Sequence, residues 1–223
     1  IGGDTIIGTT TEITEEKQAE EKEALLSEIH HRVKNNLAIV SGLLELETHD
    51  RDDKQTIEFI RKSQTRIKSM AIVHEKMYQS NNLSNVNLNE YVEELTETIR
   101  INWLNNSGDV TFDLSIGDVD ININQAIPLS LIIHELITNA IKHAFGFRQQ
   151  GRVSVSINEA SGCITLSVSD NGDNVPPDFD VENSQKLGLT LVRILTKQLN
   201  GDLTCNTEGG LSYQLSFEKK NTK

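Results

Sequence analysis

The sequence predicts two structural domains, an all-α helical hairpin followed by an α+β sandwich in which helices cover one face of a sheet. Residues 15–48 and the segment after 49–53 both place apolar side chains three and four positions apart, as in amphipathic helices. A polar linker, QSNNLSNVN at 79–87, then separates this region from strand-like runs mixed with apolar helical runs. We therefore expect the hairpin to occupy residues 15–82 and the sandwich to occupy residues 83–223.

The helical hairpin begins with a helix that we expect to extend from Glu15 to Thr48. Thr14 is a favourable N-cap, and the acidic residues of the first turns complement the helix dipole. The charged sequence HDRDD interrupts the apolar pattern and is predicted to form the turn. The second helix carries an apolar stripe made of Ile57, Ile60, Ile67, Met70, Ala71, His74 and Met77. One-sided stripes favour pairing with a second hairpin, so we expect a homodimer held by a four-helix bundle.

The second domain alternates helices with strands. A helix over 89–105 precedes the alternating strand DVTFDLSI, and the apolar helix QAIPLSLIIHELITNAIKHAF follows it. The runs GRVSVSINEA and CITLSVSD are the next two predicted strands. A loop rich in Gly, Pro and Asp leads into the helix LGLTLVRILTKQLNG, and the strands DLTCNT and LSYQLSFE end the domain. This order of elements predicts a sheet with helices on one face.

Composition excludes several classes of function. The 223 residues contain 21 Lys and Arg against 33 Asp and Glu, so the formal charge is 21 − 33 = −12. An acidic chain without a basic stripe binds nucleic acid and anionic membrane surfaces poorly, so neither is an expected partner. The sequence has no apolar run of about 18 residues and no signal peptide at its start. Cys163 and Cys205 lack CxxC spacing and are expected to stay reduced, which favours a cytoplasmic location.

Two adjacent histidines, His30 and His31, lie within the first predicted helix. With about 100° of rotation per residue, one core-facing stripe contains Leu26, Ile29, Val33, Leu37, Val40, Leu43 and Leu44. His30 lies at the edge of this stripe, whereas His31 faces away from it. An accessible neutral imidazole is a nucleophile near pH 7 and can accept a phosphoryl group. The helix geometry therefore indicates that His31 is the accessible histidine of the two.

A helix of the second domain carries candidate ligands for a phosphoryl donor. In HELITNAIKHAF, Glu135, Asn139 and Lys142 share one helix face, and His143 borders it. A carboxylate, an amide oxygen and a cation on one face suit Mg²⁺ with phosphates attached. This helix is therefore the first part of a candidate nucleotide site.

Two glycine-containing motifs extend the candidate site. In SDNGD, Asp170 ends an apolar strand, and Gly172 allows the backbone to approach a flat ligand closely. In KLGL, Gly188 opens a helix whose first backbone N–H groups favour phosphate. Each motif is weak alone, but their order along the chain indicates one nucleotide-binding site.

With these motifs in this order, the sequence resembles a sensor histidine kinase over nearly all of its length. IHHRVKNNL is similar to the phosphoacceptor segment of the subgroup with the motif H-R-x-K-N, in which the accepting histidine directly precedes Arg. HELITNAIKHAF resembles the family's N box, SDNGD its adenine-binding box, and KLGLTLVRIL its glycine box. The implied fold is a dimerising hairpin followed by an ATP-binding domain of the histidine kinase and gyrase type.

The resemblance implies autophosphorylation of His31 by ATP, followed by transfer to an aspartate of a response regulator receiver domain. The commonest members carry an acidic residue directly after the phosphoacceptor, whereas this sequence has Arg32 there. Glu28, one turn earlier, is the candidate general base. Asn35, one turn after His31, stands where relatives use an amide or hydroxyl to position water for phosphatase chemistry.

The resemblance also implies which residues contact the metal ion, the phosphates and the adenine ring of the nucleotide. Asn139 would hold Mg²⁺, and Glu135 would support the metal or polarise nearby groups. Lys142 and His143 would contact phosphates, and Asp170 would accept a hydrogen bond from the adenine amino group. The residues that would shape the pocket and its lid are Gly172 and Gly188.

The resemblance also covers the start of the sequence and leaves two alternative functions. Residues 1–14 resemble the exit from a PAS sensor domain into a signalling helix, which implies an upstream sensor. One alternative is an ATPase or protein serine kinase of the same fold, against which the accessible His31 argues. The other is a non-catalytic dimerising scaffold, which is disfavoured by the presence of Glu135, Asn139, Asp170 and Gly172.

Overall fold

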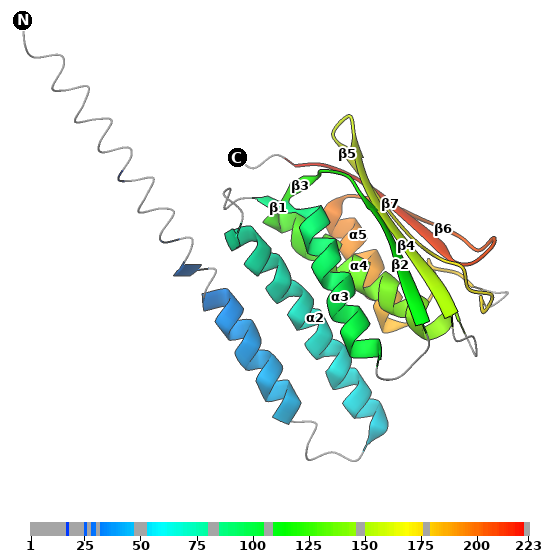
Figure 1. The fold of residues 1–223 in the computed structure, drawn as a ribbon, viewed down its shortest axis with the longest axis horizontal. Coiled ribbons are helices and arrows are strands. Elements are labelled where there is room, and N and C mark those ends of the chain that lie inside the picture. The colour runs from blue at the N-terminus through cyan, green and yellow to red at the C-terminus, as the bar shows by residue number, and fades with distance from the viewer. Residues whose placement is uncertain are drawn as a thin grey trace, which may run out of the picture.

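The computed structural model consists of a helical hairpin packed against an α/β domain, with the chain coloured from blue to red in Figure 1. The residues that it describes are 17, 25, 28–29, 32–46, 53–79, 85–104, 109–145, 150–175 and 179–220. The predicted upstream segment 1–14 lies outside these ranges, and so do both His30 and His31.

The hairpin consists of a helix over 32–46 and α2 (Lys54–Gln79), which run antiparallel (Figure 1). Lys34 Nζ lies 2.8 Å from Glu75 Oε1, and this ion pair joins the two helices. Further along, the side-chain amide of Gln64 donates a hydrogen bond to a backbone carbonyl of the first helix at 3.1 Å. The two helices predicted from the apolar spacing are therefore confirmed over the described residues, whereas residues 49–52 of the predicted turn lie outside them.

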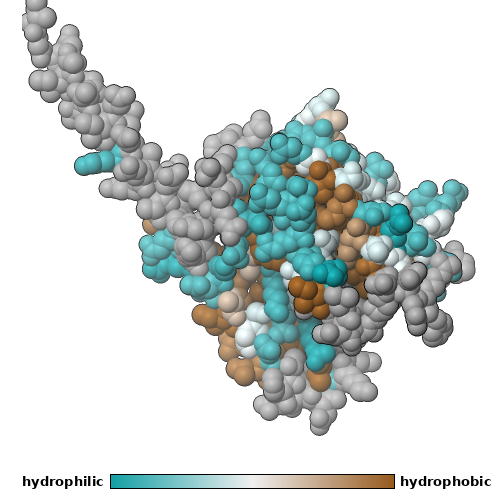
Figure 2. Space-filling model, in the orientation of Figure 1, coloured by the Kyte–Doolittle hydropathy of each residue, from teal (hydrophilic) through white to brown (hydrophobic). Residues whose placement is uncertain are grey.

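The apolar stripe predicted on the first helix is divided in the structure. Its partly buried members are Val33, Leu37 and Leu44. Its exposed members are Ile29, Val40 and Leu43, which are 45%, 44% and 57% exposed. Figure 2 shows apolar surface over the hairpin. Three of the six described members of the predicted stripe are thus not covered, because one neighbouring helix covers only one side of this helix.

α2 has a second apolar face that packs against the α/β domain. Val73 is fully buried, and Met70 and Ile72 pack against the same hydrophobic cluster. Lys76 Nζ lies 3.1 Å from Glu94 of the following helix at the edge of this contact. The predicted α2 stripe included Met70 but not Val73, because we assigned only one face of the helix to packing.

Five strands form the main sheet, in the order β2-β4-β5-β7-β6. Their bounds are β2 (Asp109–Ile116), β4 (Gln150–Ala160), β5 (Cys163–Asp170), β7 (Ser212–Glu218) and β6 (Asp202–Asn206). β2 and β4 are parallel because a helix connects them, and every other neighbouring pair is antiparallel. The alternating runs of the sequence correctly predicted each of these strands.

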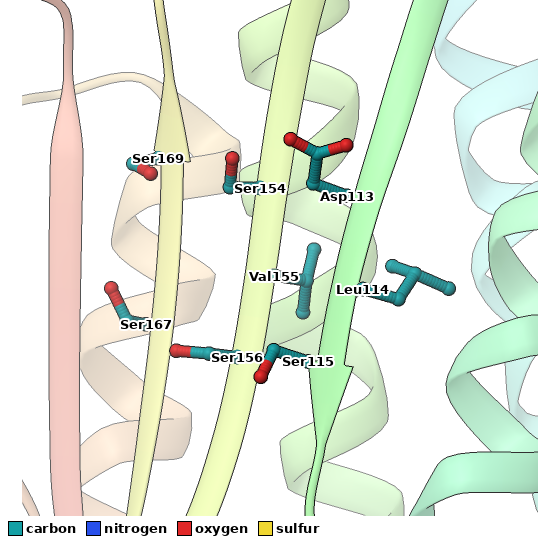
Figure 3. Close-up of a pocket in the computed structure, with 8 residues that line it drawn as sticks. All are labelled: Asp113, Leu114, Ser115, Ser154, Val155, Ser156, Ser167 and Ser169. Carbon is teal, nitrogen blue, oxygen red and sulfur yellow. The ribbon is translucent and has the colours of Figure 1, made fainter.

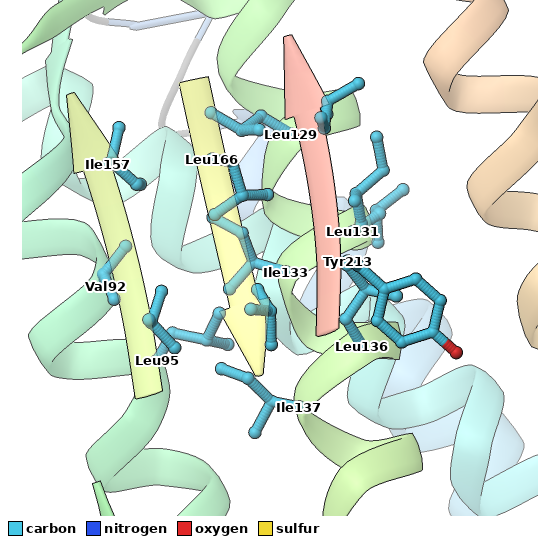
Figure 4. Close-up of a cluster of buried hydrophobic side chains, with 14 of the residues drawn as sticks. Val92, Leu95, Leu129, Leu131, Ile133, Leu136, Ile137, Ile157, Leu166 and Tyr213 are labelled. Carbon is cyan, nitrogen blue, oxygen red and sulfur yellow. The ribbon is translucent and has the colours of Figure 1, made fainter. Parts of the chain in front are cut away.

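Three helices cover one face of this sheet, as predicted. Their bounds are α3 (Leu88–Leu104), α4 (Ile123–His143) and α5 (Leu187–Leu199). Figure 4 shows apolar side chains of α3 and α4 meeting those of the strands in the hydrophobic core. Members of this core include Val92, Leu95, Leu129, Ile133, Leu136, Ile137, Ile157 and Leu166. The α4 helix is buried along most of its length, which explains its nearly continuous apolar sequence.

A second, two-stranded sheet joins the starts of α3 and α4. Its strands, β1 (Asn85–Asn87) and β3 (Asp120–Asn122), pair antiparallel. Val86 and Ile121 are register partners, and both are fully buried. We did not predict these strands, because three residues with polar flanks carry no readable alternation.

Local signals in the sequence explain where helices begin and end. The Asp53 carboxylate accepts the backbone N–H of Thr56 at 3.1 Å and so caps α2. Asn122 caps α4 in the same way through the N–H of Gln125. Asn200 ends α5 in the left-handed conformation, which asparagine tolerates better than most residues. None of the helices in the described part of the chain is both long and apolar enough to cross a lipid bilayer.

The opposite face of the main sheet is polar and rich in serine. Figure 3 shows a shallow groove there, of about 150 Å³, with the hydroxyl side chains of neighbouring strands along it. Its polar lining consists of Asp113, Ser115, Ser154, Ser156, Ser167 and Ser169. Alternation along each strand accounts for this face, because the inward positions are taken by core residues. The groove contains none of the predicted site residues.

Candidate nucleotide-binding site

A cavity of about 270 Å³ lies where the end of α4 meets the end of β5 and the starts of α5 and β7. Three residues predicted from the sequence line it, namely Asn139, His143 and Asp170. The other lining residues are Ala144, Asn174, Val175, Phe179, Lys186, Leu189, Leu211 and Tyr213. An apolar wall with a few polar groups is typical of a site for a small ligand.

Asp170, the last residue of β5, is the buried acid of this cavity and is 8% exposed. Its Oδ1 accepts the backbone N–H groups of Gly172 at 2.9 Å and Leu211 at 3.3 Å. Burial raises the pKa of the Asp170 carboxyl, and the two N–H donors offset only part of that rise. Both described hydrogen bonds use Oδ1, so Oδ2 is the atom that can accept from a ligand amino group.

The loop after β5 is held closely against the end of α4. A Cβ at Gly172 would clash with the backbone carbonyl of Ala144, so only glycine permits this approach. Asn174 Nδ2 donates to the His143 carbonyl at 2.9 Å, which satisfies one of the free acceptors at the helix end. Gly172 therefore shapes the cavity from behind, while Asn174 and Val175 reach its wall. We did not predict these two residues, because the loop has no periodic pattern.

Two aromatic rings form part of the apolar wall. The ring centroids of Phe179 and Tyr213 are 6.4 Å apart and the planes meet at 76°, an edge-to-face contact. Burial raises the pKa of the Tyr213 phenol, which therefore stays protonated. Figure 4 shows the Tyr213 ring at the margin of the core, with its hydroxyl pointing away from the cluster. The inward alternation of β7 could have predicted Tyr213, whereas Phe179 lies in an irregular loop.

The start of α5 provides the positive side of the cavity. The N-cap residue Lys186 makes no capping hydrogen bond through its side chain, so N–H groups of the first turn stay available for an anion. Lys186 and His143 both line the cavity. A Cβ at Gly188 would lie 2.6 Å from Glu135 Oε2, so glycine lets the start of α5 approach α4. Lys142, also predicted at this site, is partly buried on α4 and does not line the cavity.

Arg193 of α5 holds the loop that precedes this helix. Its guanidinium donates to the carbonyls of Val181 at 2.6 Å and Ser184 at 2.8 Å, and to the Thr190 hydroxyl at 3.2 Å. The held loop connects Phe179 with Lys186, both of which line the cavity. We did not predict Arg193, because the contact joins a helix to a loop that has no pattern of its own.

Glu135 lies one helical turn before Asn139, but its carboxylate does not line the cavity. It makes two hydrogen bonds with Arg66 of α2, from Nε to Oε1 at 2.6 Å and from Nη2 to Oε2 at 2.9 Å. His134 Nδ1 is 3.4 Å from Oε1, although neither ring nitrogen makes a hydrogen bond within the described part of the chain. Burial raises the pKa of Glu135, but His134 and Arg66 together lower it further, to about 2.

The predicted phosphoacceptor His31 lies outside the described residues, and its neighbours are described only in part. Glu28 accepts a hydrogen bond from Arg32 Nε at 2.9 Å, and this ion pair is exposed. Asn35 is exposed on the helix over 32–46. The candidate base and the predicted phosphatase residue are thus both at the surface of the hairpin.

Two family models match the chain in separate segments. Residues 28–103 match the model described as "Histidine kinase". Residues 124–221 match the model described as "Histidine kinase-, DNA gyrase B-, and HSP90-like ATPase". The first segment contains the hairpin and the second contains the whole cavity.

Curated relatives and solved structures agree with these matches. The chain is 33% identical over 216 residues to the sensor histidine kinase PdtaS of Mycolicibacterium smegmatis, covering 91% of this chain and 41% of the relative. It is 27% identical over 198 residues to a blue-light-activated histidine kinase 2 of Erythrobacter litoralis, covering 86% of this chain and 56% of the relative. The chain thus spans about half or less of the length of these relatives.

The fold resembles that of solved histidine kinases. A histidine kinase domain from a blue-light-activated kinase of Erythrobacter litoralis has a TM-score of 0.65 at 23% identity, covering 91% of this chain and 94% of that one. Acinetobacter baumannii AdeS has a TM-score of 0.53 at 14% identity, covering 84% of this chain and 97% of that one. The two family matches account for different parts of the same chain. The chain therefore belongs to the histidine kinases.

Proposed function

We propose that this chain is the core of a sensor histidine kinase that uses ATP and Mg²⁺ to phosphorylate His31. The phosphoryl group would then pass to an aspartate of a response regulator receiver domain. The observation that carries the proposal is the cavity, with buried Asp170 beside an apolar wall and Lys186 and His143 on the positive side. This cavity belongs to a domain that follows a hairpin, and the hairpin lies in the segment that matches the model described as "Histidine kinase".

The cavity suits ATP in one orientation. Asp170 Oδ2 would accept a hydrogen bond from the adenine amino group, and the purine would lie against Phe179, Tyr213 and Leu189. The phosphates would then extend toward the start of α5, where backbone N–H groups and Lys186 favour negative charge. Guanine presents a carbonyl where adenine presents the amino group, so Asp170 would discriminate against it.

The residues present fit a magnesium ion. Mg²⁺ prefers oxygen ligands and commonly takes only one or two from the protein, with phosphates and water as the others. Asn139 lines the cavity and offers its side-chain oxygen. When bound, the ion would neutralise charge on the phosphates. Glu135 would support this role from one turn earlier on α4, and Lys142 would add positive charge nearby.

The reaction at His31 would be nucleophilic. A nitrogen of the neutral imidazole would form a bond to the γ-phosphorus as the bond to the bridging oxygen of ADP breaks. The attacking nitrogen carries a lone pair and no proton, whereas the other ring nitrogen carries one, so the phosphorylated ring is positively charged until a base removes that proton. Glu28 is the carboxylate closest in sequence on the outward face, and its ion pair with Arg32 would hold it there. Asn35 is exposed and would orient the water that hydrolyses the phosphoryl group of a phosphorylated regulator, which is phosphatase chemistry.

The exposed apolar surface of the hairpin supports a homodimer. The residues that form this surface are Ile29, Ile39, Val40, Leu43, Leu46 and Phe59. Contiguous apolar surface of this kind marks an interaction site more often than chance exposure. Pairing of two hairpins would bury it in a four-helix bundle, and a PAS-type sensor upstream of residue 15 would act on that bundle.

Labelling with γ-labelled ATP and Mg²⁺ tests the proposed function. The expected product carries label that is stable to base and lost in acid, as phosphohistidine is. Acid-stable label would instead indicate a serine kinase of the same fold, and this would contradict the proposal. Absence of label, in a preparation that binds ATP, would indicate a scaffold or an ATPase and would contradict it as well.

A further inference from the structure

A buried ion pair joins the hairpin to the nucleotide-binding domain at a predicted site residue. Arg66 of α2 uses Nε and Nη2 to bind both carboxylate oxygens of Glu135, at 2.6 and 2.9 Å. The two side chains are only 15% and 7% exposed. Two-point binding of this kind is the strongest arrangement of a guanidinium and a carboxylate. It leaves the Glu135 carboxylate on Arg66 and outside the cavity that Asn139 lines.

The ion pair is part of a wider contact between the two domains. Val73 and Ser69, on the same helix as Arg66, are 0% and 1% exposed. Near the end of α2, Lys76 lies 3.1 Å from Glu94 and 3.7 Å from Glu90 of α3. α2 thus packs against the nucleotide-binding domain over most of its second half. Within this contact, Arg66 binds α4 and Lys76 binds α3.

The docked arrangement places the cavity far from the end of the hairpin where Lys34 pairs with Glu75. Lys34 follows His31 by three residues in the sequence and pairs with Glu75. Glu75 is 75 − 66 = 9 residues from Arg66, or about 14 Å along α2. α4 runs antiparallel to α2 (Figure 1), so Asn139 lies beyond Glu135 in the direction away from Lys34. Phosphoryl transfer requires the reacting atoms to approach to about 3–3.5 Å.

We propose that Arg66 is a latch that holds the kinase in a docked, non-transferring state by binding the Glu135 carboxylate. The inference rests on the proposed function, because it assigns Glu135 to the nucleotide site. While the ion pair is closed, Glu135 is kept from the metal and phosphates, and the nucleotide-binding domain stays at the wrong level of the hairpin. Opening the ion pair releases the Glu135 carboxylate and the nucleotide-binding domain at the same time, so a signal that moves α2 would control catalysis.

The charge state of Glu135 agrees with this role. Arg66 and His134 hold its pKa near 2 despite burial, and a carboxylate with so low a pKa is a weak proton acceptor. Loss of Arg66 would remove one of the two causes that lower the pKa of Glu135, so that pKa would rise. The released carboxylate would therefore be better suited to polarise groups around the nucleotide.

The test compares Arg66→Gln with Arg61→Gln in the protein from residue 1 to residue 223. Arg61 is an exposed arginine of α2 that makes no described ion pair, so the control removes the same charge from the same helix. Initial rates of His31 labelling are measured at saturating ATP. Arg66→Gln should label about tenfold faster, within the usual range of coupling between two sites, and Arg61→Gln should match wild type. Arg66→Lys keeps the charge but loses the two-point contact, and should give an intermediate rate.

A second readout does not depend on kinase activity. Amide hydrogen exchange of α2 and α4 should increase in Arg66→Gln and in Glu135→Gln, and the double variant should show no further increase. Unchanged exchange in Arg66→Gln, or equal changes in Arg61→Gln, would overturn the latch even if the protein proved not to be a histidine kinase. Slower labelling in Arg66→Gln and Arg66→Lys, with both variants folded, would also overturn it. That result would make Arg66 a residue that positions Glu135 for catalysis.

Discussion

The nucleotide cavity and the helical hairpin differ in how their surfaces are covered. Around Asp170, the cavity is shaped by close contacts with the backbone, including the N–H groups of Gly172 and Leu211 and the carbonyl of Ala144. On the helix over 32–46, several large apolar side chains are more than half exposed, as Ile39 is at 61%. The difference indicates a preformed ligand site beside a hairpin whose final contacts are made with another molecule or in another state. The same substitution, glycine to alanine, should therefore lower the free energy of unfolding at the cavity and raise it on the hairpin.

Gly172→Ala should produce the largest effect. The added Cβ would meet the backbone of Ala144, which has no flexible side chain to move aside. Overpacking of this kind costs about 1–3 kcal/mol, and we expect the upper end of that range together with loss of ATP binding. Urea denaturation and calorimetric titration measure the two effects. Wild-type stability in this variant would show that the cavity wall is not held as tightly as we infer.

Asp170→Asn should weaken ATP binding with little change in folding. The asparagine oxygen can still accept from the N–H groups of Gly172 and Leu211, but an NH₂ group would then face the adenine amino group. A mispaired buried group costs about 1–3 kcal/mol, so the Kd should rise by roughly tenfold to a hundredfold.

The matched control is Asp113→Asn, which removes an exposed carboxylate bound by Arg152 on the open face of the sheet. It should leave ATP affinity unchanged. GTP should compete poorly with ATP in the wild-type protein. Equal competition by the two nucleotides would remove the adenine-recognition role from Asp170.

Arg193→Met should loosen the loop between Phe179 and Lys186. The variant loses the hydrogen bonds to the carbonyls of Val181 and Ser184 while keeping much of the side-chain volume. A charged hydrogen bond contributes about 1.5–3 kcal/mol, and solvent would replace part of this, so we expect a Kd about fivefold to tenfold higher. Exchange of amides over 181–186 should increase in parallel. Unaltered exchange there would mean that the loop is held by other contacts.

Gly42→Ala should have the smallest effect and the opposite sign from Gly172→Ala. A Cβ at Gly42 meets nothing within 4 Å, and the residue lies inside the helix over 32–46. Alanine is favoured over glycine in a helix by about 1 kcal/mol, so the unfolding free energy should rise by up to that amount. Destabilisation would instead reveal a close neighbour at this surface, such as the second hairpin of a dimer.

The sequence predicted the parts of the site that lie on periodic elements. Asp170, Asn139 and His143 lie on a regular strand and a regular helix, and the order of their motifs along the sequence predicted that they would share one site. Phe179 lies in an irregular loop, where no periodicity exists to read. Arg66 belongs to a helix that was predicted correctly, but its partner is 69 residues away, and only the packing of α2 on α4 brings them together.

The hairpin shows what helical periodicity cannot predict even where the helices themselves are regular. Helical periodicity correctly predicted two antiparallel helices, yet it could not divide their apolar residues between neighbours. Val73 packs on the nucleotide-binding domain, whereas Leu43 is exposed, although both are apolar residues at helical spacing. Hydrophobic periodicity identifies which side of a helix is apolar, but the partner that covers that side is a property of the tertiary structure.

The identity of the labelled residue tests the central claim most directly. The protein is labelled with γ-labelled ATP and Mg²⁺, digested at neutral or basic pH, and the labelled peptide is sequenced. We expect acid-labile label on His31, no label in His31→Gln at unchanged ATP affinity, and nearly full label in His30→Gln. Label that persists in His31→Gln and disappears in His30→Gln, or that resists acid, would contradict the account.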